Sequence, residues 1–125
     1  MLTLLGSGNS ILDLGSAASS STVAFANSSV FSWNGSSILK VYDWNGVANV
    51  GGGADHIYVG LDVSGLTPTQ LSQIQFYSDA GFSPIGSGAN ILSSGEVVAT
   101  PEPTLLSLIG FGALGLMGRR RRRQR

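Results

Sequence analysis

Residues 55–63 read Asp-His-Ile-Tyr-Val-Gly-Leu-Asp-Val, and this stretch decides the fold class. Large aliphatic residues occupy every second position, namely Ile57, Val59, Leu61 and Val63, and between them stand His56, Tyr58, Gly60 and Asp62. A period of two places the aliphatic side chains on one face of an extended strand. The stretch therefore predicts a half-buried β-strand in a mainly β protein.

Shorter runs with the same period lie on both sides of this strand. Strands are expected around Val23 and Phe25, from Ile38 to Trp44, from Gln73 to Tyr77 and from Glu96 to Ala99. Within the second run, Leu39, Val41 and Asp43 are expected on one face, and Tyr42 and Trp44 on the other. One helical turn is expected from Thr67 to about Ser72, because Thr67 and Gln70 have capping-box spacing around Pro68.

Two Asn-Gly dipeptides predict how the strands are joined. Asn34-Gly35 and Asn45-Gly46 each follow a tryptophan, and Asn-Gly favours the positive φ angles of tight hairpins. Residues 31–46 are therefore expected to form a meander of successive hairpins. Two architectures stay open for residues 1–99, a small antiparallel β-sandwich-like domain and the end of a β-solenoid, because both contain short alternating strands with Gly and Asn turns.

Three aromatic residues in this region are candidates for stacking on a sugar: Trp33, Tyr42 and Trp44. Exposed rings in these positions would suit a polysaccharide-binding module. The competing interpretation, which a small domain favours, is that the rings close the hydrophobic core. An ice-binding surface is the other binding alternative, but the threonines show no regular ladder.

The sequence offers little for metal binding or catalysis. Residues 50–57 match most of one nonapeptide calcium repeat, which makes Asp55 a weak calcium candidate, but one copy lacks half a site and Asp55 is expected to hold a turn. The chain has one histidine, His56, and no cysteine, so multi-histidine and thiolate sites are excluded. No serine lies in a Gly-x-Ser-x-Gly elbow. We expect no cofactor and no enzymatic activity.

The last part of the chain has a second clear pattern. Residues 104–118 carry no charge and no proline, and as a helix they would span about 22 Å, less than the roughly 30 Å of a bilayer core. Arginine side chains can reach the lipid phosphates and support so short a span. We expect a transmembrane helix anchored by Leu105, Leu106, Leu108, Ile109, Phe111, Leu114, Leu116 and Met117, with lipid contacts from Arg119, Arg120, Arg121, Arg122 and Arg123.

The arginine cluster also predicts the orientation and the charge of the two parts of the chain. Basic residues beside an apolar segment stay on the cytoplasmic side, so the body is expected outside and the C-terminus inside. The apolar run argues against a nucleic-acid-binding arm. Residues 1–118 hold seven acidic residues and one lysine, a net charge of −6, and residues 119–125 hold six arginines. A body this acidic is suited to solubility.

The order Pro101-Glu102-Pro103, apolar segment and terminal arginine cluster resembles the PEP-CTERM sorting signal of exported proteins of Gram-negative bacteria. The resemblance implies a sorting signal over residues 100–125 and an exosortase, a membrane-embedded protease, as partner. It further implies cleavage at or near Pro101-Glu102-Pro103 and passage of the body from the inner membrane to the cell surface or exopolysaccharide matrix. The run from Gly51 to Val98 is similar to passenger domains that accompany this signal, whose activity is unassigned.

An exported protein is expected to begin with a signal peptide, and residues 1–15 do not have that pattern. They lack a basic residue, and Gly6, Gly8, Asn9 and Asp13 interrupt their apolar runs. The prediction is that residues 1–99 are the C-terminal part of a longer passenger domain, with further strands upstream in the same reading frame.

Overall fold

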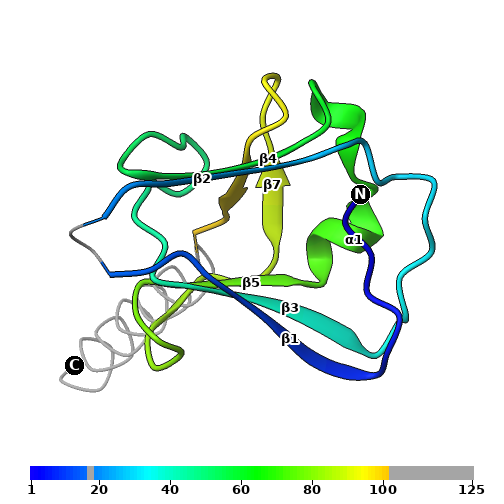
Figure 1. Cartoon of the computed structure of the whole chain (residues 1–125), viewed down its shortest axis with the longest axis horizontal. Coiled ribbons are helices and arrows are strands. Elements are labelled where there is room, and N and C mark those ends of the chain that lie inside the picture. Colours follow the sequence, from blue (N-terminus) through cyan, green and yellow to red (C-terminus); the bar gives the residue numbers. More distant parts are fainter. Residues whose placement is uncertain (17–18, 102–125) are drawn as a thin grey trace, which may run out of the picture.

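The computed structural model describes residues 1–16 and 19–101, and these are mainly β (Figure 1). Glu102 and Pro103 of the sorting motif, the apolar segment 104–118 and the arginine cluster 119–125 lie outside the described residues. Among the described residues, no helix has both the length and the apolar character needed to span a bilayer.

The described residues form three small sheets. The first has the strand order β1-β3-β5-β6, the second pairs β2 with β4, and the third pairs β7 with β8. The strands are β1 (Gly8–Asp13), β2 (Ser21–Phe25), β3 (Ser37–Tyr42), β4 (Asp55–Val59), β5 (Ile74–Tyr77), β6 (Pro84–Ile85), β7 (Ala89–Ile91) and β8 (Val97–Ala99). Two short helices, η1 (Val63–Gly65) and α1 (Pro68–Ser72), lie between β4 and β5.

The long strands pair in parallel, which overturns the antiparallel expectation for them. β1, β3 and β5 are parallel neighbours, and β2 is parallel to β4. Antiparallel pairing is found between β5 and β6 and between β7 and β8. Each Asn-Gly dipeptide leads the chain toward another sheet or another layer, so the predicted meander over residues 31–46 is wrong.

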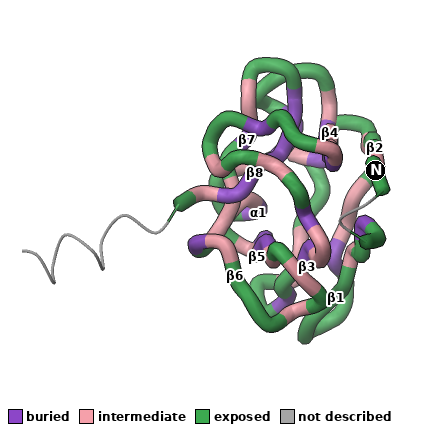
Figure 2. Tube along the Cα trace, turned by 90° about the vertical axis from the view of Figure 1, so that its left-hand side faces the viewer, coloured by how far each residue is buried: buried purple, intermediate pink, exposed green. Residues whose placement is uncertain are grey.

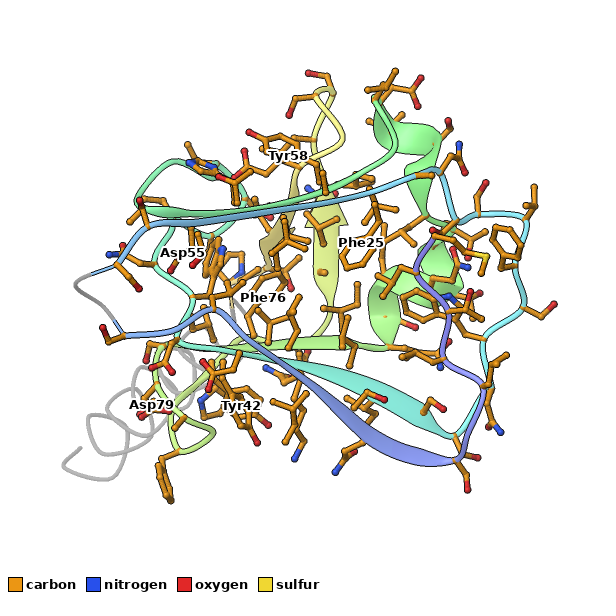
Figure 3. All side chains as sticks on the ribbon, viewed as in Figure 1. Phe25, Tyr42, Asp55, Tyr58, Phe76 and Asp79 are labelled. Atoms are coloured by element: carbon orange, nitrogen blue, oxygen red, sulfur yellow. The ribbon has the colours of Figure 1, made fainter. Side chains whose placement is uncertain are left out.

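At several interior positions the parallel register places apolar residues beside apolar residues. Leu12 lies beside Val41, and Val41 lies beside Phe76. In the second sheet, Val23 lies beside Ile57 and Phe25 beside Val59. These columns face each other across the interior, where Figure 3 shows Phe25 and Phe76 between the two sheets. The buried core comprises Leu4, Leu14, Leu39, Val41, Trp44, Ile57, Val59, Leu66, Ile74, Phe76, Ile91, Val97, Val98 and Ala99.

The strand predicted over residues 57–63 is shorter than expected. Ile57 and Val59 are buried as predicted, but β4 ends at Val59 and Leu61 is 90% exposed. The cause is Gly60, whose φ of +73° turns the chain out of the strand. The alternation therefore continues in the sequence for two aliphatic positions after the strand has ended.

The expected strand at residues 38–44 is confirmed as β3, but its last residues depart from the alternation. Leu39 and Val41 are buried on the predicted face. Asp43 has a φ of +58°, a left-handed conformation that reverses which side the following residue faces. Trp44 is therefore buried in the core, where its ring lies 4.8 Å from that of Phe76.

The predicted helical turn is confirmed as α1. The Thr67 N–H donates to Gln70 Oε1 over 2.8 Å, and the Gln70 N–H donates to Thr67 Oγ1 over 3.2 Å, which is a complete capping box. The expected closing strand is confirmed as β8, and its partner β7 was not predicted.

Candidate functional site

The sorting motif begins where the folded body ends. Val98 and Ala99 of β8 are fully buried, Thr100 is half-buried and Pro101 is exposed. The Thr100 hydroxyl donates to the Ser87 carbonyl oxygen over 2.7 Å, which fixes the last residue before the motif on the β6–β7 loop. Figure 2 shows this exit from the body next to β8. The chain thus passes from a buried strand to an exposed proline within two residues.

The close approach of Thr100 to the β6–β7 loop requires a glycine in that loop. Gly86 has a φ of +58°, and a Cβ atom there would overlap the carbonyl oxygen of Thr100. Gln75 Nε2 donates to the Gly86 carbonyl oxygen over 2.6 Å, which ties the same loop to β5. Thr100, where the chain leaves the body, therefore lies against the loop at Gly86, and Gln75 joins that loop to β5. The sequence alone did not indicate a role for Gly86.

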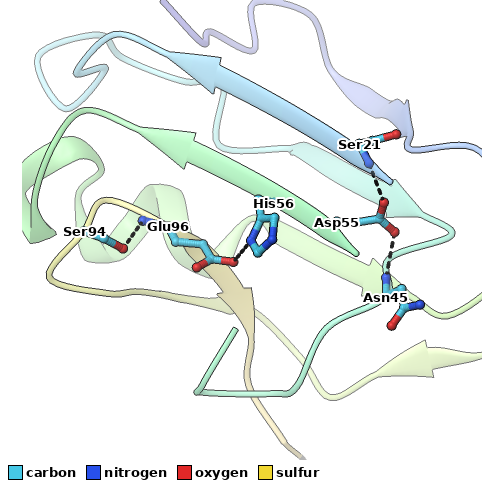
Figure 4. Close-up of polar contacts among 6 residues, drawn as sticks. All are labelled: Ser21, Asn45, Asp55, His56, Ser94 and Glu96. Carbon is cyan, nitrogen blue, oxygen red and sulfur yellow. Dashed lines mark hydrogen bonds and ion pairs between the residues drawn. The ribbon is translucent and has the colours of Figure 1, made fainter. Parts of the chain in front are cut away.

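Asp55 is the weak calcium candidate, and both of its carboxylate oxygens accept hydrogen bonds from backbone N–H groups (Figure 4). Asp55 is fully buried at the start of β4. The N–H of Ser21 donates to its Oδ1 over 3.0 Å, and the N–H of Asn45 donates to its Oδ2 over 2.9 Å. Asp55 thereby links the beginning of β2 to the loop before β4, and this accounts for its burial. Across residues 1–16 and 19–101, no three His, Asp or Glu residues cluster as metal ligands.

A second polar contact joins His56 of β4 to Glu96, next to β8. His56 Nδ1 lies 2.8 Å from Glu96 Oε1, with the two side chains 27% and 9% exposed (Figure 4). Gly51 is needed for this approach, because a Cβ atom there would lie 2.8 Å from Glu96 Oε2. Tyr58 stacks on the His56 ring at 6.1 Å. Sequence reasoning missed this pair, since 40 residues separate its members and no local pattern joins them.

The three candidate stacking residues occupy different environments. Trp44 is 3% exposed and packs on Phe76, so its ring is a core element and presents no face to a ligand. Trp33 is half-buried, and its Nε1–H donates to the Leu2 carbonyl oxygen over 3.1 Å. Tyr42 is half-buried on the outer face of the first sheet, edge-on to Tyr77 at 5.4 Å. The structure does not bring the three rings into one surface.

A shallow groove of about 360 Å³ lies on the outer face of the first sheet. Asn9, Lys40, Gln75 and Tyr77 are among its lining residues. Lys40 is the only lysine or arginine before residue 119, and its ammonium lies 5.9 Å from the centre of the Tyr77 ring. The groove therefore combines an aromatic ring, a cation and amide groups on one surface.

An acidic cluster lies at one end of β3. Partial burial of Asp43 raises the pKa of its carboxyl, and a hydrogen bond with Asp13 and the negative charges of Asp13, Asp79 and Asp55 raise it further. Asp79 has the opposite behaviour, because hydrogen bonds from Ser83, Phe82 and Gly81 hold its pKa below the usual range. The cluster therefore contains one carboxylate destabilised by its surroundings and one stabilised by a turn.

The comparison with known families identifies the C-terminal segment. The model of the PEP-CTERM protein-sorting motif matches residues 99–123. No curated protein and no solved structure matches the chain. The motif marks a protein that is exported, sorted by an exosortase through the membrane and displayed at the surface. The match begins at Ala99, the last residue of β8.

Proposed function

We propose that this protein is a surface or extracellular-matrix protein whose sorting segment anchors it in the inner membrane until an exosortase cleaves at or near Pro101-Glu102-Pro103. The observation that carries the proposal is the junction between the body and the motif. Ala99 is fully buried, whereas Pro101 is exposed. A protease can therefore reach the motif without unfolding β8.

The charge distribution supports transient anchoring with the body outside. The segment 104–118 carries no charge, and Arg119 to Arg123 follow it directly. Arginines retained on the cytoplasmic side give the orientation with the body outside and the C-terminus inside. Cleavage near the motif separates these arginines from the acidic body, so the released body keeps a net negative charge that opposes self-association and nucleic-acid binding.

The body itself is proposed to be a non-enzymatic module built as the end of a β-solenoid. Parallel pairing of β1 with β3 and β5, and of β2 with β4, favours successive coils over a sandwich of antiparallel sheets. Apolar side chains that lie side by side in register, as Leu12, Val41 and Phe76 do, support the same interpretation. Such a body would act in the matrix by its surface and not by catalysis.

The proposed processing is tested by the mass of the mature C-terminus in membrane and extracellular fractions of the native host. An extracellular form that ends at or near Pro103, together with a membrane form that keeps Arg125, is the expected result. Replacing Glu102 with alanine is expected to shift the protein toward the membrane form, whereas Thr104→Ala should leave processing unchanged. Protein that keeps Arg125 and is soluble in the cytoplasm would overturn the proposal.

Polysaccharide binding is a second candidate, supported by the groove on the first sheet. Tyr77 and Lys40 line it together with amide side chains, a combination that suits a sugar ring bearing hydroxyl or carboxylate groups. Retarded migration in gels containing the host exopolysaccharide, lost in Tyr77→Ala and kept in Trp33→Ala, is the expected result. Equal mobility with and without the polysaccharide would exclude it.

A further inference from the structure

The tripeptide Trp-Asn-Gly occurs twice in the body, at residues 33–35 and 44–46. Asparagine before glycine is especially prone to spontaneous deamidation, because glycine has no side chain to obstruct the attack of its backbone nitrogen on the asparagine amide. Asparagine is accordingly one of the residues depleted in proteins that work at high temperature. The two sites carry the same reacting groups, so any difference in their reactivity comes from the fold.

The side chain of Asn34 is held by a hydrogen bond. Asn34 is half-buried, and its Oδ1 accepts from the Ser36 N–H over 2.9 Å. For deamidation the Cγ atom must rotate toward the Gly35 nitrogen, and this rotation takes Oδ1 away from the Ser36 N–H. The loss of one hydrogen bond of ordinary strength before the reaction slows it by about threefold to tenfold.

The side chain of Asn45 has no such restraint. Asn45 is exposed, and within residues 1–16 and 19–101 neither its Oδ1 nor its Nδ2 has a hydrogen-bond partner. The N–H groups of Gly35 and Gly46 donate to no acceptor within these ranges, so the two attacking nitrogens are alike. The amide of Asn45 is therefore the freer of the two to react.

We propose that Asn45 is a modification site, at which the protein converts its own asparagine to isoaspartate with water as the co-reactant. The Gly46 nitrogen loses its proton and bonds to Asn45 Cγ, while the bond from Cγ to the amide nitrogen breaks and ammonia leaves. Water then opens the cyclic imide at one of its two carbonyl groups. Opening at the former main-chain carbonyl gives isoaspartate, in which the chain runs through Cγ and the former main-chain carbonyl is a carboxylate.

The main-chain groups of Asn45 hold the start of β4, so this product is expected to loosen it. The Asn45 N–H donates to Asp55 Oδ2 over 2.9 Å (Figure 4). The Asn45 carbonyl oxygen accepts from the N–H groups of Ala54 and Asp55 over 3.1 and 3.2 Å. In isoaspartate this oxygen belongs to a carboxylate, which places a second negative charge beside the fully buried Asp55.

The longer chain path also conflicts with the packing of the next residue. Isoaspartate adds one carbon atom to the main chain between residue 45 and Gly46. Gly46 lies so close to the Trp44 ring that a Cβ atom there would overlap it. The added atom therefore displaces either Gly46 or the buried Trp44 ring, and both changes are expected to destabilise the fold.

The relative rates at the two asparagines test the site. The full chain is warmed in mild detergent at weakly alkaline pH, and deamidation at each asparagine is followed by peptide mass spectrometry. In the folded protein Asn45 is expected to react at least about threefold faster than Asn34. In concentrated urea, where neither site is structured, the two rates should become equal. Equal rates in the folded protein, or a faster reaction at Asn34, would overturn the proposal.

Melting temperatures test the consequence for β4. Wild-type protein that has been warmed until an isoaspartyl methyltransferase labels residue 45 is expected to melt at a lower temperature than fresh protein. Fresh Asn45→Asp carries the charge without the altered chain path and should melt as the wild type does. Warmed Asn45→Gln should keep its melting temperature, because glutamine must close a larger ring and reacts far more slowly. Labelled protein that melts with the fresh protein would refute the loosening of β4.

Discussion

At the scale of single residues, backbone conformation at Asp43 decides the position of the largest core ring. Few non-glycine residues adopt a φ near +58°, and aspartate and asparagine do so more readily than most. This conformation directs Trp44 into the core beside Phe76. The same residue carries a carboxylate close to Asp13 and Asp79. Asp43 therefore combines a required conformation with an unfavourable charge.

Replacement of Asp43 with asparagine is expected to raise the melting temperature at neutral pH. The folded-state pKa of Asp43 is raised, so its ionised form destabilises the fold at a pH above that raised value, and the cost disappears as the pH falls below the unfolded value. Asparagine keeps the left-handed backbone and removes the charge. Thermal unfolding of the wild type and the variant at neutral pH and at about pH 3 measures the difference in melting temperature, which should vanish at the acidic pH.

The variant Asp62→Asn is a control in which the melting temperature is expected to change in the opposite direction. The pKa of Asp62 is lowered by hydrogen bonds from Ser64, whose N–H donates to its Oδ1 over 2.8 Å. A lowered pKa stabilises the fold above the unfolded value, and this contribution is lost as the pH falls. Asp62→Asn should therefore lower the melting temperature at neutral pH. If both variants shift it in the same direction, the electrostatic explanation is wrong.

At the scale of elements, α1 is both a capped turn and a clamp on a distant loop. Gln70 Nε2 donates to the carbonyl oxygens of Ser28 and Phe31 over 3.0 and 2.8 Å. Gln73, just after α1, donates in the same way to Asn34 and Ser37. The spacing of Thr67 and Gln70 predicted the cap. It carried no information on the clamp, because the acceptors lie about forty residues earlier.

The replacement Gln70→Glu is expected to keep the capping hydrogen bond from Thr67 and to remove the hydrogen bonds to Ser28 and Phe31. A glutamate can still accept from the Thr67 N–H, but it cannot donate to the carbonyl oxygens of Ser28 and Phe31. The Ser28 carbonyl keeps only its hydrogen bond from the Phe31 N–H, and both carbonyls then lie beside a buried negative charge. We expect a loss of about 1–3 kcal/mol in the free energy of unfolding, measured by urea denaturation. Thr69→Ala, an exposed change in the same helix, should be near neutral. A glutamate variant as stable as the wild type would show that the clamp contributes nothing.

At the scale of the whole molecule, the buried core of the described residues and the match to the sorting motif occupy different parts of the chain. The buried core residues extend from Leu4 to Ala99. The match to the sorting motif starts at Ala99 and runs to residue 123. The acidic and basic charges divide in the same way. This separation is what a processing event requires, since the released body must keep its fold after the segment is removed.

A chain that ends after Pro101 is therefore expected to fold as the full chain does. Its core contains every residue from Leu4 to Ala99 that is buried in the structure, so its melting temperature should equal that of the full chain in detergent. Differential scanning calorimetry of the two proteins measures this. A chain shortened to Asn90 is the control, because it lacks β8 and the fully buried Val97, Val98 and Ala99, and it should not unfold cooperatively.

Local features of this protein could be predicted from its amino-acid sequence. Alternating residues located β3, β4 and β5, a capping box located α1, and three adjacent patterns located the sorting segment that the family comparison confirms. All of these depend on residues within a few positions of each other, because strand faces, helix caps and apolar segments are properties of the local chain. The alternating pattern nevertheless predicted a strand longer than β4, because Gly60 ends the strand after Val59.

Strand pairing and strand direction could not be predicted from the sequence and are known from the folded structure. A period of two specifies a buried face but not the neighbour that covers its edge, and the parallel partners β1 and β3 start 29 residues apart. The same holds for the Glu96 contact with His56, the Gln70 clamp and the burial of Trp44. Each depends on the meeting of segments far apart in the chain, whose distance in space is set by the packing of the whole core and not by any local sequence pattern.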